Sequence, residues 1–178
     1  MTMEKNWYAV YTKNNFELKV AAQLSKKKIT NFCPLNSSTD AGSNGKKIYR
    51  FPVLTSLVFV HIDKVELEKI KEIKAVKNLM FWLGNPVRIP SKEIEQLEAF
   101  CKSFSNISVE KTTVNDASML LLKKSSYVDF ENFSVSAKKN LITLHLPTVG
   151  LNLSAITDIN NTVTTEAGLQ HGLELDVT

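Results

Sequence analysis

A short aromatic and β-branched run near the start of the chain passes directly into a segment with helical spacing. The residues Trp7 to Thr12 are of the types that favour a strand. Asn14 or Asn15 can cap the helix that follows. Apolar residues then recur at helical intervals at Phe16, Val20, Ala21 and Leu24. This junction predicts a fold in which helices pack on a sheet.

Further extended segments are expected between residues 29 and 83. Their bounds are Ile29–Leu35, Ile48–Pro52, Leu57–Ile62 and Val76–Leu83. The segment Leu57–Ile62 is almost continuously apolar, which predicts burial on both of its faces. The polar stretch Asn36–Gly45 predicts a flexible loop or the tip of a hairpin.

Two more helices are expected after the first one. Asp63 can cap one of them, and its apolar side would carry Val65, Ile70 and Ile73. Ser91 can cap the other. The apolar positions of that last helix are Ile94, Leu97, Cys101 and Phe104. The order β-α-β-β-α-β-α predicts the α+β class, with an antiparallel sheet flanked by helices.

The character of the sequence changes after Phe104. Residues 107–116 are polar and have no helical period, so we expect a domain at 1–106, a linker at 107–116, a second domain at 117–160 and a tail at 161–178. Short apolar runs with close spacing predict that the second domain is a small SH3-like β-barrel. These runs are 119–122, 127–133, 141–146 and 151–156.

Basic residues are concentrated in the first third of the chain. Residues 1–50 contain nine Lys or Arg residues against three acidic ones, although the net charge of the whole chain is only +4. This asymmetry suggests a face that meets nucleic acid phosphates or an acidic partner. An ordinary solvated surface is the alternative. The triplet Lys26–Lys28 also has a structural reason, because cations complement the negative end of a helix dipole.

The sequence argues against several other classes of protein. No apolar stretch approaches the roughly 20 residues of a membrane span, so we expect no membrane partner. Cys33 and Cys101 are far apart, which favours buried thiols and a cytoplasmic protein. The histidines His61, His145 and His171 lack metal-ligand spacing. There is no Gly-rich phosphate loop or nucleophile motif, so we expect no cofactor and no enzymatic activity.

Several stretches, in the same order, resemble the N-terminal domain of the NusG family of transcription elongation factors. These stretches are the Trp7–Lys13 strand, the helix ending at Lys26–Lys28, Asn31–Leu35, the polar loop with Lys46 and Lys47, Val53–Val60, and Trp82–Ile94. The stretch Leu141–Leu153 resembles the end of the SH3-like KOW domain that follows in this family, although residues 125–139 lack the glycines of its first hairpin.

The chain also departs from the usual pattern of the family. Thr55 and Leu57 stand where a proline and an aromatic residue are usual. This departure suggests a specialised paralogue that acts on particular operons rather than a general factor. The suggestion rests on analogy within the family.

The resemblance implies a factor that binds the clamp helices of RNA polymerase and suppresses pausing or termination. The matching positions are Tyr11, Leu54, Leu57, Phe59 and Phe81. An apolar patch with a basic rim suits a helical hairpin with apolar and acidic side chains. A core position is the alternative, and it is favoured for Phe59. Strand phase decides whether Phe81 or Trp82 faces the partner.

Contact with the non-template or upstream DNA is also implied by the resemblance. The matching positions are Lys13, Asn14 and Asn15 after the first strand, and Lys46, Lys47 and Arg50 on the hairpin. Asparagine can bond to base edges, whereas lysine meets phosphate without reading the sequence. Helix capping by an asparagine and a solvated hairpin are the structural alternatives.

Two other functions stay open at this stage. The chain can be a nucleic-acid-binding module that acts independently of polymerase, with steeply salt-dependent binding. Alternatively, the small barrel can bind another protein, such as a ribosomal or termination-factor protein, through Tyr127, Phe130 or Phe133. For these three aromatic residues a place in the barrel core is the favoured interpretation.

Overall fold

The computed structural model describes residues 4–42, 45–112, 133–136 and 140–156 of the 178-residue chain. The helices in this part are α1 (Glu17–Lys26), α2 (Lys64–Lys71) and α3 (Ser91–Ser103). The first sheet contains β1 (Asn6–Thr12), β2 (Thr30–Phe32), β5 (Leu57–Ile62), β6 (Val76–Leu79) and β9 (Arg88–Ile89). Its strands follow the order β2-β5-β1-β6, β9 also pairs with β1, and all pairs are antiparallel.

The two faces of the first sheet carry different helices. Val10 pairs with Val58 in the centre of the sheet, and both pack in a cluster with α1 and α2. The neighbouring pair, Ala9 and Phe59, belongs to the cluster on the opposite face, which includes α3. Because successive side chains in a strand alternate between faces, β5 is buried on both of them, as its apolar sequence predicts.

The starts of α1 and α2 differ from each other. At α2, the Asp63 carboxylate accepts hydrogen bonds from the backbone N–H groups of Val65 and Glu66, and Glu66 completes a capping box. The predicted Asp63 cap is therefore confirmed, although Val65 is exposed. At α1, Phe16 is the N-cap residue and no side chain caps the helix, so the prediction of an asparagine cap is wrong. Phe16 is exposed as well, and the inward position is taken by the side chain of Glu17.

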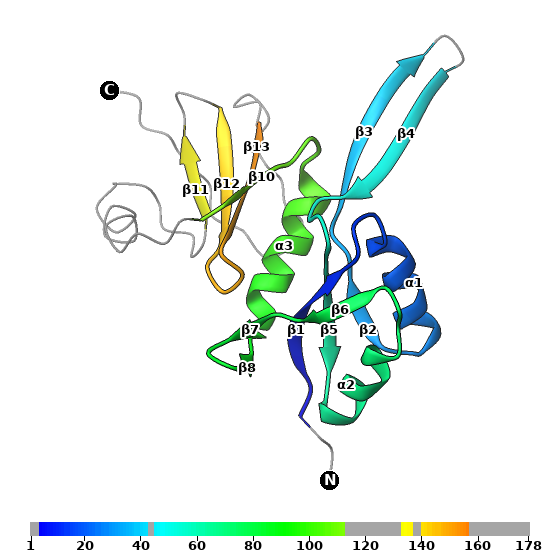
Figure 1. Ribbon diagram of the computed structural model, residues 1–178. Helices are drawn as coiled ribbons and strands as arrows, with labels where there is room; N and C mark the ends of the chain where they lie inside the picture. The colour runs from blue at the N-terminus through cyan, green and yellow to red at the C-terminus, as the bar shows by residue number, and fades with distance from the viewer. Residues whose placement is uncertain (1–3, 43–44, 113–132, 137–139, 157–178) are drawn as a thin grey trace.

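A long two-stranded ribbon extends from the first sheet (Figure 1). It consists of β3 (Leu35–Gly42) and β4 (Gly45–Pro52), which pair from Leu35–Pro52 to Gly42–Gly45. For Asn36–Gly45 the polar sequence predicted a flexible loop or the tip of a hairpin, and the structure has a hairpin whose paired strands extend through most of that stretch. Antiparallel pairing satisfies the backbone groups of an exposed ribbon whatever its side chains are, and this explains the difference.

A second, open sheet, which we call the C-terminal sheet, follows α3. Its strands are β10 (Ser108–Lys111), β11 (Phe133–Ser136), β12 (Leu141–Leu146) and β13 (Leu151–Ile156), in the order β10-β13-β12-β11. The predicted linker at 107–116 thus contains a strand of this sheet. Among the residues that the structure describes, these strands form no closed barrel. The apolar run 119–122 and most of 127–133 lie outside the described residues.

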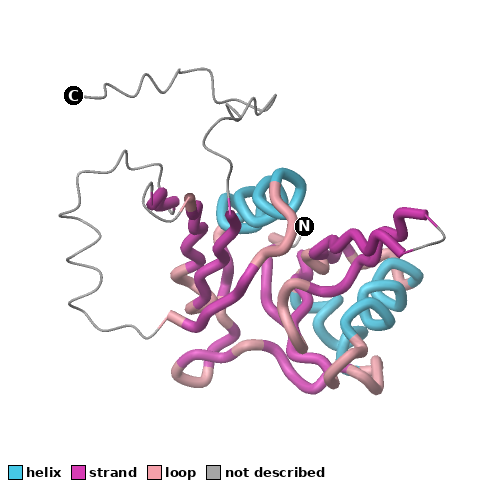
Figure 2. Tube along the Cα trace, turned by 90° about the horizontal axis from the view of Figure 1, so that it is seen from above, coloured by secondary structure: helices cyan, strands magenta, loops and turns pink. Residues whose placement is uncertain are grey.

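Helix α3 lies between the two sheets (Figures 1 and 2). The helix begins at Ser91 with Pro90 as the N-cap residue, so the predicted Ser91 cap is wrong. Leu97 and Phe100 are fully buried in a cluster that contains residues of both sheets. The C-terminal sheet contributes Leu144, Leu146, Leu153 and Ala155. The two sheets therefore share one hydrophobic core.

We expect both cysteine thiols to react slowly in the folded protein. Cys33 and Cys101 are free and half-buried. Burial raises the pKa of Cys33 to about 11, with the nearby charge of Glu17 adding to the effect, and raises the pKa of Cys101 to about 12. Only the thiolate is nucleophilic, so at pH 8 alkylation of either thiol should be more than about 100-fold slower than that of an ordinary cysteine.

The measurement is intact-mass analysis during iodoacetamide treatment at pH 8. The same protein in denaturant is the control, and both of its thiols should react at the ordinary rate. Fast modification of the native protein at either position would contradict the burial described here.

Candidate functional site

Four of the five residues matched to polymerase contact lie on one face of the first sheet. Tyr11 pairs with Leu57, and Ala9 pairs with Phe59, so these side chains share a face. Leu54, in the turn before β5, belongs to the same cluster. We call the set Ala9, Tyr11, Leu54, Leu57 and Phe59 the apolar face. The fold thus brings together residues that are up to 50 positions apart in the sequence.

The apolar face is largely closed in this structure. Tyr11, at the edge, is 38% exposed, whereas Phe59 is only 1% exposed. Leu54 and Leu57 are buried as well. A partner contact requires an open surface. Such a surface is not present at Leu54, Leu57 and Phe59, because these side chains pack in the core shared with α3 and the C-terminal sheet.

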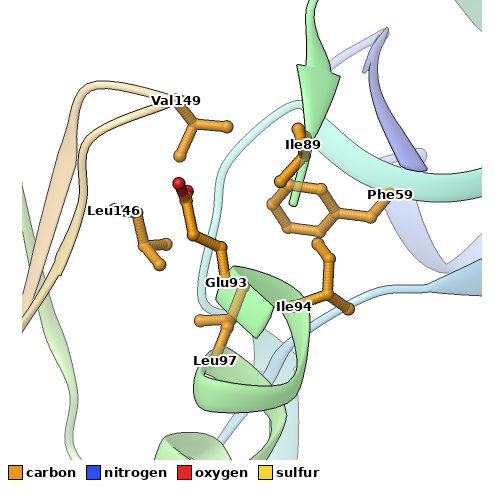
Figure 3. A pocket seen from close by; sticks show the side chains of 7 residues that line it. All are labelled: Phe59, Ile89, Glu93, Ile94, Leu97, Leu146 and Val149. Carbon is orange, nitrogen blue, oxygen red and sulfur yellow. The ribbon is translucent and has the colours of Figure 1, made fainter. Parts of the chain in front are cut away.

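The C-terminal sheet reaches the apolar face directly. A small pocket is lined by Phe59 and Ile89 on one side and by Leu146 and Val149 on the other (Figure 3). The remaining lining residues are Glu93, Ile94 and Leu97 of α3. Since Leu146 and Val149 belong to β12 and the turn after it, the turn between β12 and β13 covers the Phe59 end of the apolar face.

One asparagine anchors the start of the C-terminal sheet. Asn36 in β3 is buried, and its side chain makes two hydrogen bonds with the backbone of Ile107. Asn36 Nδ2 donates to the Ile107 carbonyl at 3.1 Å, and the Ile107 N–H donates to Asn36 Oδ1 at 3.2 Å. The segment between α3 and β10 is therefore held against the base of the ribbon. Sequence analysis missed Asn36, since a polar residue in a polar stretch gives no sign of burial.

Exposed apolar side chains lie next to the apolar face, on the hairpin of β7 (Phe81–Trp82) and β8 (Asn85–Pro86). The Met80 N–H donates to the carbonyl of Ala9 at 2.8 Å, which places the hairpin at the edge of the face. Phe81, Trp82 and Leu83 are 51%, 72% and 85% exposed. Phe81 and Trp82 are thus both accessible. Sequence analysis missed Leu83, although the following Gly84 marked a turn.

The residues matched to DNA contact after β1 lie in a turn that is hydrogen-bonded to the turn before β5. The Ser56 hydroxyl donates to Asn14 Oδ1 at 2.6 Å, and the Ser56 N–H donates to Glu17 Oε1 at 2.5 Å. The turn between β1 and α1 is therefore tied to the turn before β5. Asn14 has a structural partner, whereas Lys13 and Asn15 are exposed.

The ribbon adds a basic residue flanked by large apolar ones. Arg50 is exposed, and so are Ile48, Tyr49 and Phe51 around it. The side chains of Lys46 and Lys47 lie outside what the structure describes. Because β4 leads into the turn that holds Ser56, the ribbon base and the turn before α1 lie at the same end of the first sheet (Figure 1).

The outer face of the C-terminal sheet carries a polar network. His145 Nε2 lies 2.9 Å from Ser134 Oγ, and His145 Nδ1 lies 2.9 Å from Asn152 Oδ1. On the inner side, the ring of Phe133 packs 6.3 Å from that of Phe100, as its favoured interpretation as a core residue predicts. Tyr127 and Phe130 lie outside the described residues.

Two further searches cover the described part of the chain. It contains no group of three or more His, Cys, Asp or Glu side chains able to hold a metal ion. None of its helices has both the length and the apolar character needed to cross a membrane.

Comparisons with known proteins give one family match. The sequence profile of the family described as "Transcription termination factor nusG" matches residues 5–98. A search of curated proteins finds no match.

Similar solved structures include one described as "Domain interaction in Thermotoga maritima NusG". It has 13% identity and a TM-score of 0.48, and the match covers 88% of this chain and 94% of the other. A crystal structure of the MjSpt4:Spt5 complex has 18% identity and a TM-score of 0.32, and the match covers 85% of this chain and 93% of the other.

We expect Asn36→Ala to loosen the attachment of the C-terminal sheet. The substitution leaves a buried N–H and a buried carbonyl of Ile107 without partners. Such groups cost roughly 1–3 kcal/mol each, so the free energy of unfolding should fall by at least about 2 kcal/mol. Urea unfolding measures this change. Ser37→Ala, the neighbouring residue on the other face of the ribbon, is the matched control and should have little effect. Equal effects of the two substitutions would contradict the anchoring role.

Proposed function

Because this chain belongs to the NusG family of transcription factors, we propose that it is an elongation or antitermination factor that binds the clamp helices of RNA polymerase. The observation that carries the proposal is the grouping of Tyr11, Leu54, Leu57 and Phe59 on one face of the first sheet. Phe81 stands exposed at the edge of the same face. An apolar surface of this kind suits the apolar side of a helical hairpin.

Polymerase binding then requires the apolar face to open. Leu54, Leu57 and Phe59 are buried, and the turn between β12 and β13 covers the Phe59 end. Tyr11 and Phe81 are accessible in the closed arrangement and are available for the first contact. Release of the C-terminal sheet from α3 would then expose the Phe59 end of the face. The apparent affinity for polymerase is the affinity of the open form multiplied by the fraction of the protein that is open.

Contact with the non-template or upstream DNA strengthens the proposed complex. Lys13 and Asn15 are exposed in the turn after β1, and Arg50 is exposed at the base of the ribbon. The cationic side chains meet phosphates, and the neighbouring Tyr49 and Phe51 offer rings on which unpaired bases can stack. Asn14 acts in this proposal by fixing the turn through Ser56.

The proposed mechanism is a bridge across the polymerase cleft that keeps the clamp closed around DNA. A factor bound to the closed clamp disfavours the open, paused state. It needs a higher affinity for the closed clamp, since equal affinity for both states shifts neither. The C-terminal sheet as a docking site for a ribosomal or termination-factor protein stays a prediction.

We expect the purified protein to bind core RNA polymerase of its own host, with Tyr11→Ala and Phe81→Ala each weakening binding about tenfold. Truncation of an aromatic residue that anchors an interface costs more than about 1 kcal/mol, and 1.4 kcal/mol corresponds to a factor of ten. Biolayer interferometry measures the affinity. Val65→Ala removes an exposed apolar side chain from α2, away from the apolar face, and should leave the affinity unchanged.

Two outcomes would contradict the proposal. If polymerase binds but the lifetimes of transcriptional pauses do not change, the partner is right and the mechanism is wrong. If the protein binds free DNA or RNA with steep salt dependence and shows no affinity for polymerase, the independent nucleic-acid-binding module is the better description.

A further inference from the structure

One carboxyl group is buried where the C-terminal sheet meets α3. Glu93 lies in the first turn of α3 and is 5% exposed. Its Oε1 accepts a hydrogen bond from the hydroxyl of Thr148, in the turn between β12 and β13. Its Oε2 is buried and has no hydrogen-bond partner among the described residues. Figure 3 shows the carboxyl group directed toward Leu146 and Val149.

Among the residues that the structure describes, no charged side chain other than Glu93 lines the pocket around this carboxyl group. The residues that face it are Phe59 of β5, Ile89 of β9, Ile94 and Leu97 of α3, Leu146 of β12 and Val149 of the following turn. The pocket is too small to admit a water molecule. The nearest charged residues in the sequence, Arg88, Lys92 and Glu95, are exposed. Within the described part of the chain, a negative charge on Glu93 has the Thr148 hydrogen bond but no cation in the pocket to compensate it.

This environment favours the protonated carboxyl group. Burial raises the pKa of Glu93 above its ordinary value of 4.5, and the hydrogen bonds from Thr148 oppose that rise only in part. Release of the C-terminal sheet would remove Leu146, Thr148 and Val149 and return the carboxylate to water. The closed arrangement therefore binds a proton at Glu93 more tightly than the open one.

We propose that Glu93 is a protonation-dependent latch, which holds the C-terminal sheet on α3 when it is neutral and loosens the sheet when it is ionised. The latch would regulate access to the apolar face, and this consequence rests on the proposed function. The buried Oε2 atom, the Thr148 hydrogen bond and the apolar pocket at the junction of α3 with both sheets carry the proposal.

The direction of the pH effect follows from linkage. Well below pH 4.5 Glu93 is neutral in both arrangements, and the closed one has its full stability. As the pH rises from there through the raised pKa, the open arrangement loses its proton first. The equilibrium constant for closing then falls, by at most about tenfold for each pH unit, and becomes constant above the raised pKa.

Hydrogen–deuterium exchange of the full chain tests the latch without polymerase. Protection of peptides from β12, β13 and α3 is measured between pH 5 and pH 8 and corrected for the intrinsic exchange rate. In wild type, protection should fall as the pH rises. In Glu93→Gln this fall in protection should be absent. Any remaining change between pH 5 and pH 8 should be less than about twofold and comes from other titrating groups. Glu95→Gln, an exposed neighbour on α3, is the matched control and should follow wild type.

A second variant separates the latch from simple misfit of the glutamine amide. Glu93→Met places an apolar side chain in the apolar pocket and should also remove the pH dependence, with protection at pH 8 above that of wild type. His61 and His145 are present in every variant, so the differences between variants report Glu93 alone. A wild-type pH dependence that persists in both Glu93 variants would overturn the proposal.

Failure of the latch is distinguishable from failure of the proposed function. If the exchange results are as expected but no variant binds polymerase, the latch stands and the function is wrong. If polymerase binds and Glu93→Gln changes neither exchange nor affinity at pH 8, the function stands and the latch is wrong. With both correct, Glu93→Gln should weaken polymerase binding at pH 8 by the factor by which it favours closing.

Discussion

Helix α3 is buried on two sides, and both sheets of the protein depend on that burial. Leu97 is inaccessible to solvent, and the ring of Phe100 packs 4.9 Å from Phe104 and 6.3 Å from Phe133. Burial of one such side chain contributes about 1.5–3 kcal/mol. The C-terminal sheet has an apolar inner face and must cover it with another layer, and in the described structure that layer is α3.

The two ends of this packing differ in how well their polar groups are satisfied. Near the C-terminal end of α3, Asn36 pairs fully with the backbone of Ile107. Near the N-terminal end, Glu93 keeps one carboxylate oxygen without a partner. A buried polar pair with all its hydrogen bonds stabilises the closed arrangement. A buried polar group without a partner reduces the free-energy difference between the closed and the open arrangement. The proposed latch therefore acts at the β12–β13 turn and not where the C-terminal sheet begins.

The proposed function and the closed arrangement compete for one surface. The apolar face packs in the core that the C-terminal sheet shares, and the same side chains suit a helical partner. A partner shifts the protein toward the open form only to the extent that it binds the open form more tightly than the closed form. The exposed hairpin with Phe81 and Trp82 lies at the edge of this surface and needs no such opening.

Local patterns were sufficient for much of the first sheet. The aromatic run of β1, the continuous apolar run of β5 and the Asp63 cap each carry a signal that neighbouring residues create by themselves. The failures have a different cause. Phe16 and Val65 stand at helical intervals, but each helix meets the sheet with a narrower face than the pattern suggests. The polar ribbon became two strands because β3 and β4 pair with each other, and β10 became a strand because the distant β13 was available to pair with it.

The sequence by itself determined the α+β class and the strand and helix types of the strongest segments, whereas the positions matched to polymerase contact came from the family resemblance and their common face from the strand register. The class and the element types follow from side-chain periodicity, which acts over a few residues. Only the tertiary structure decided that Leu54, Leu57 and Phe59 are covered while Phe81, Trp82 and Leu83 are exposed. Exposure depends on which distant layer packs on a face. Here that layer consists of α3 and the C-terminal sheet, and the spacing of the residues that it covers does not indicate which layer it is.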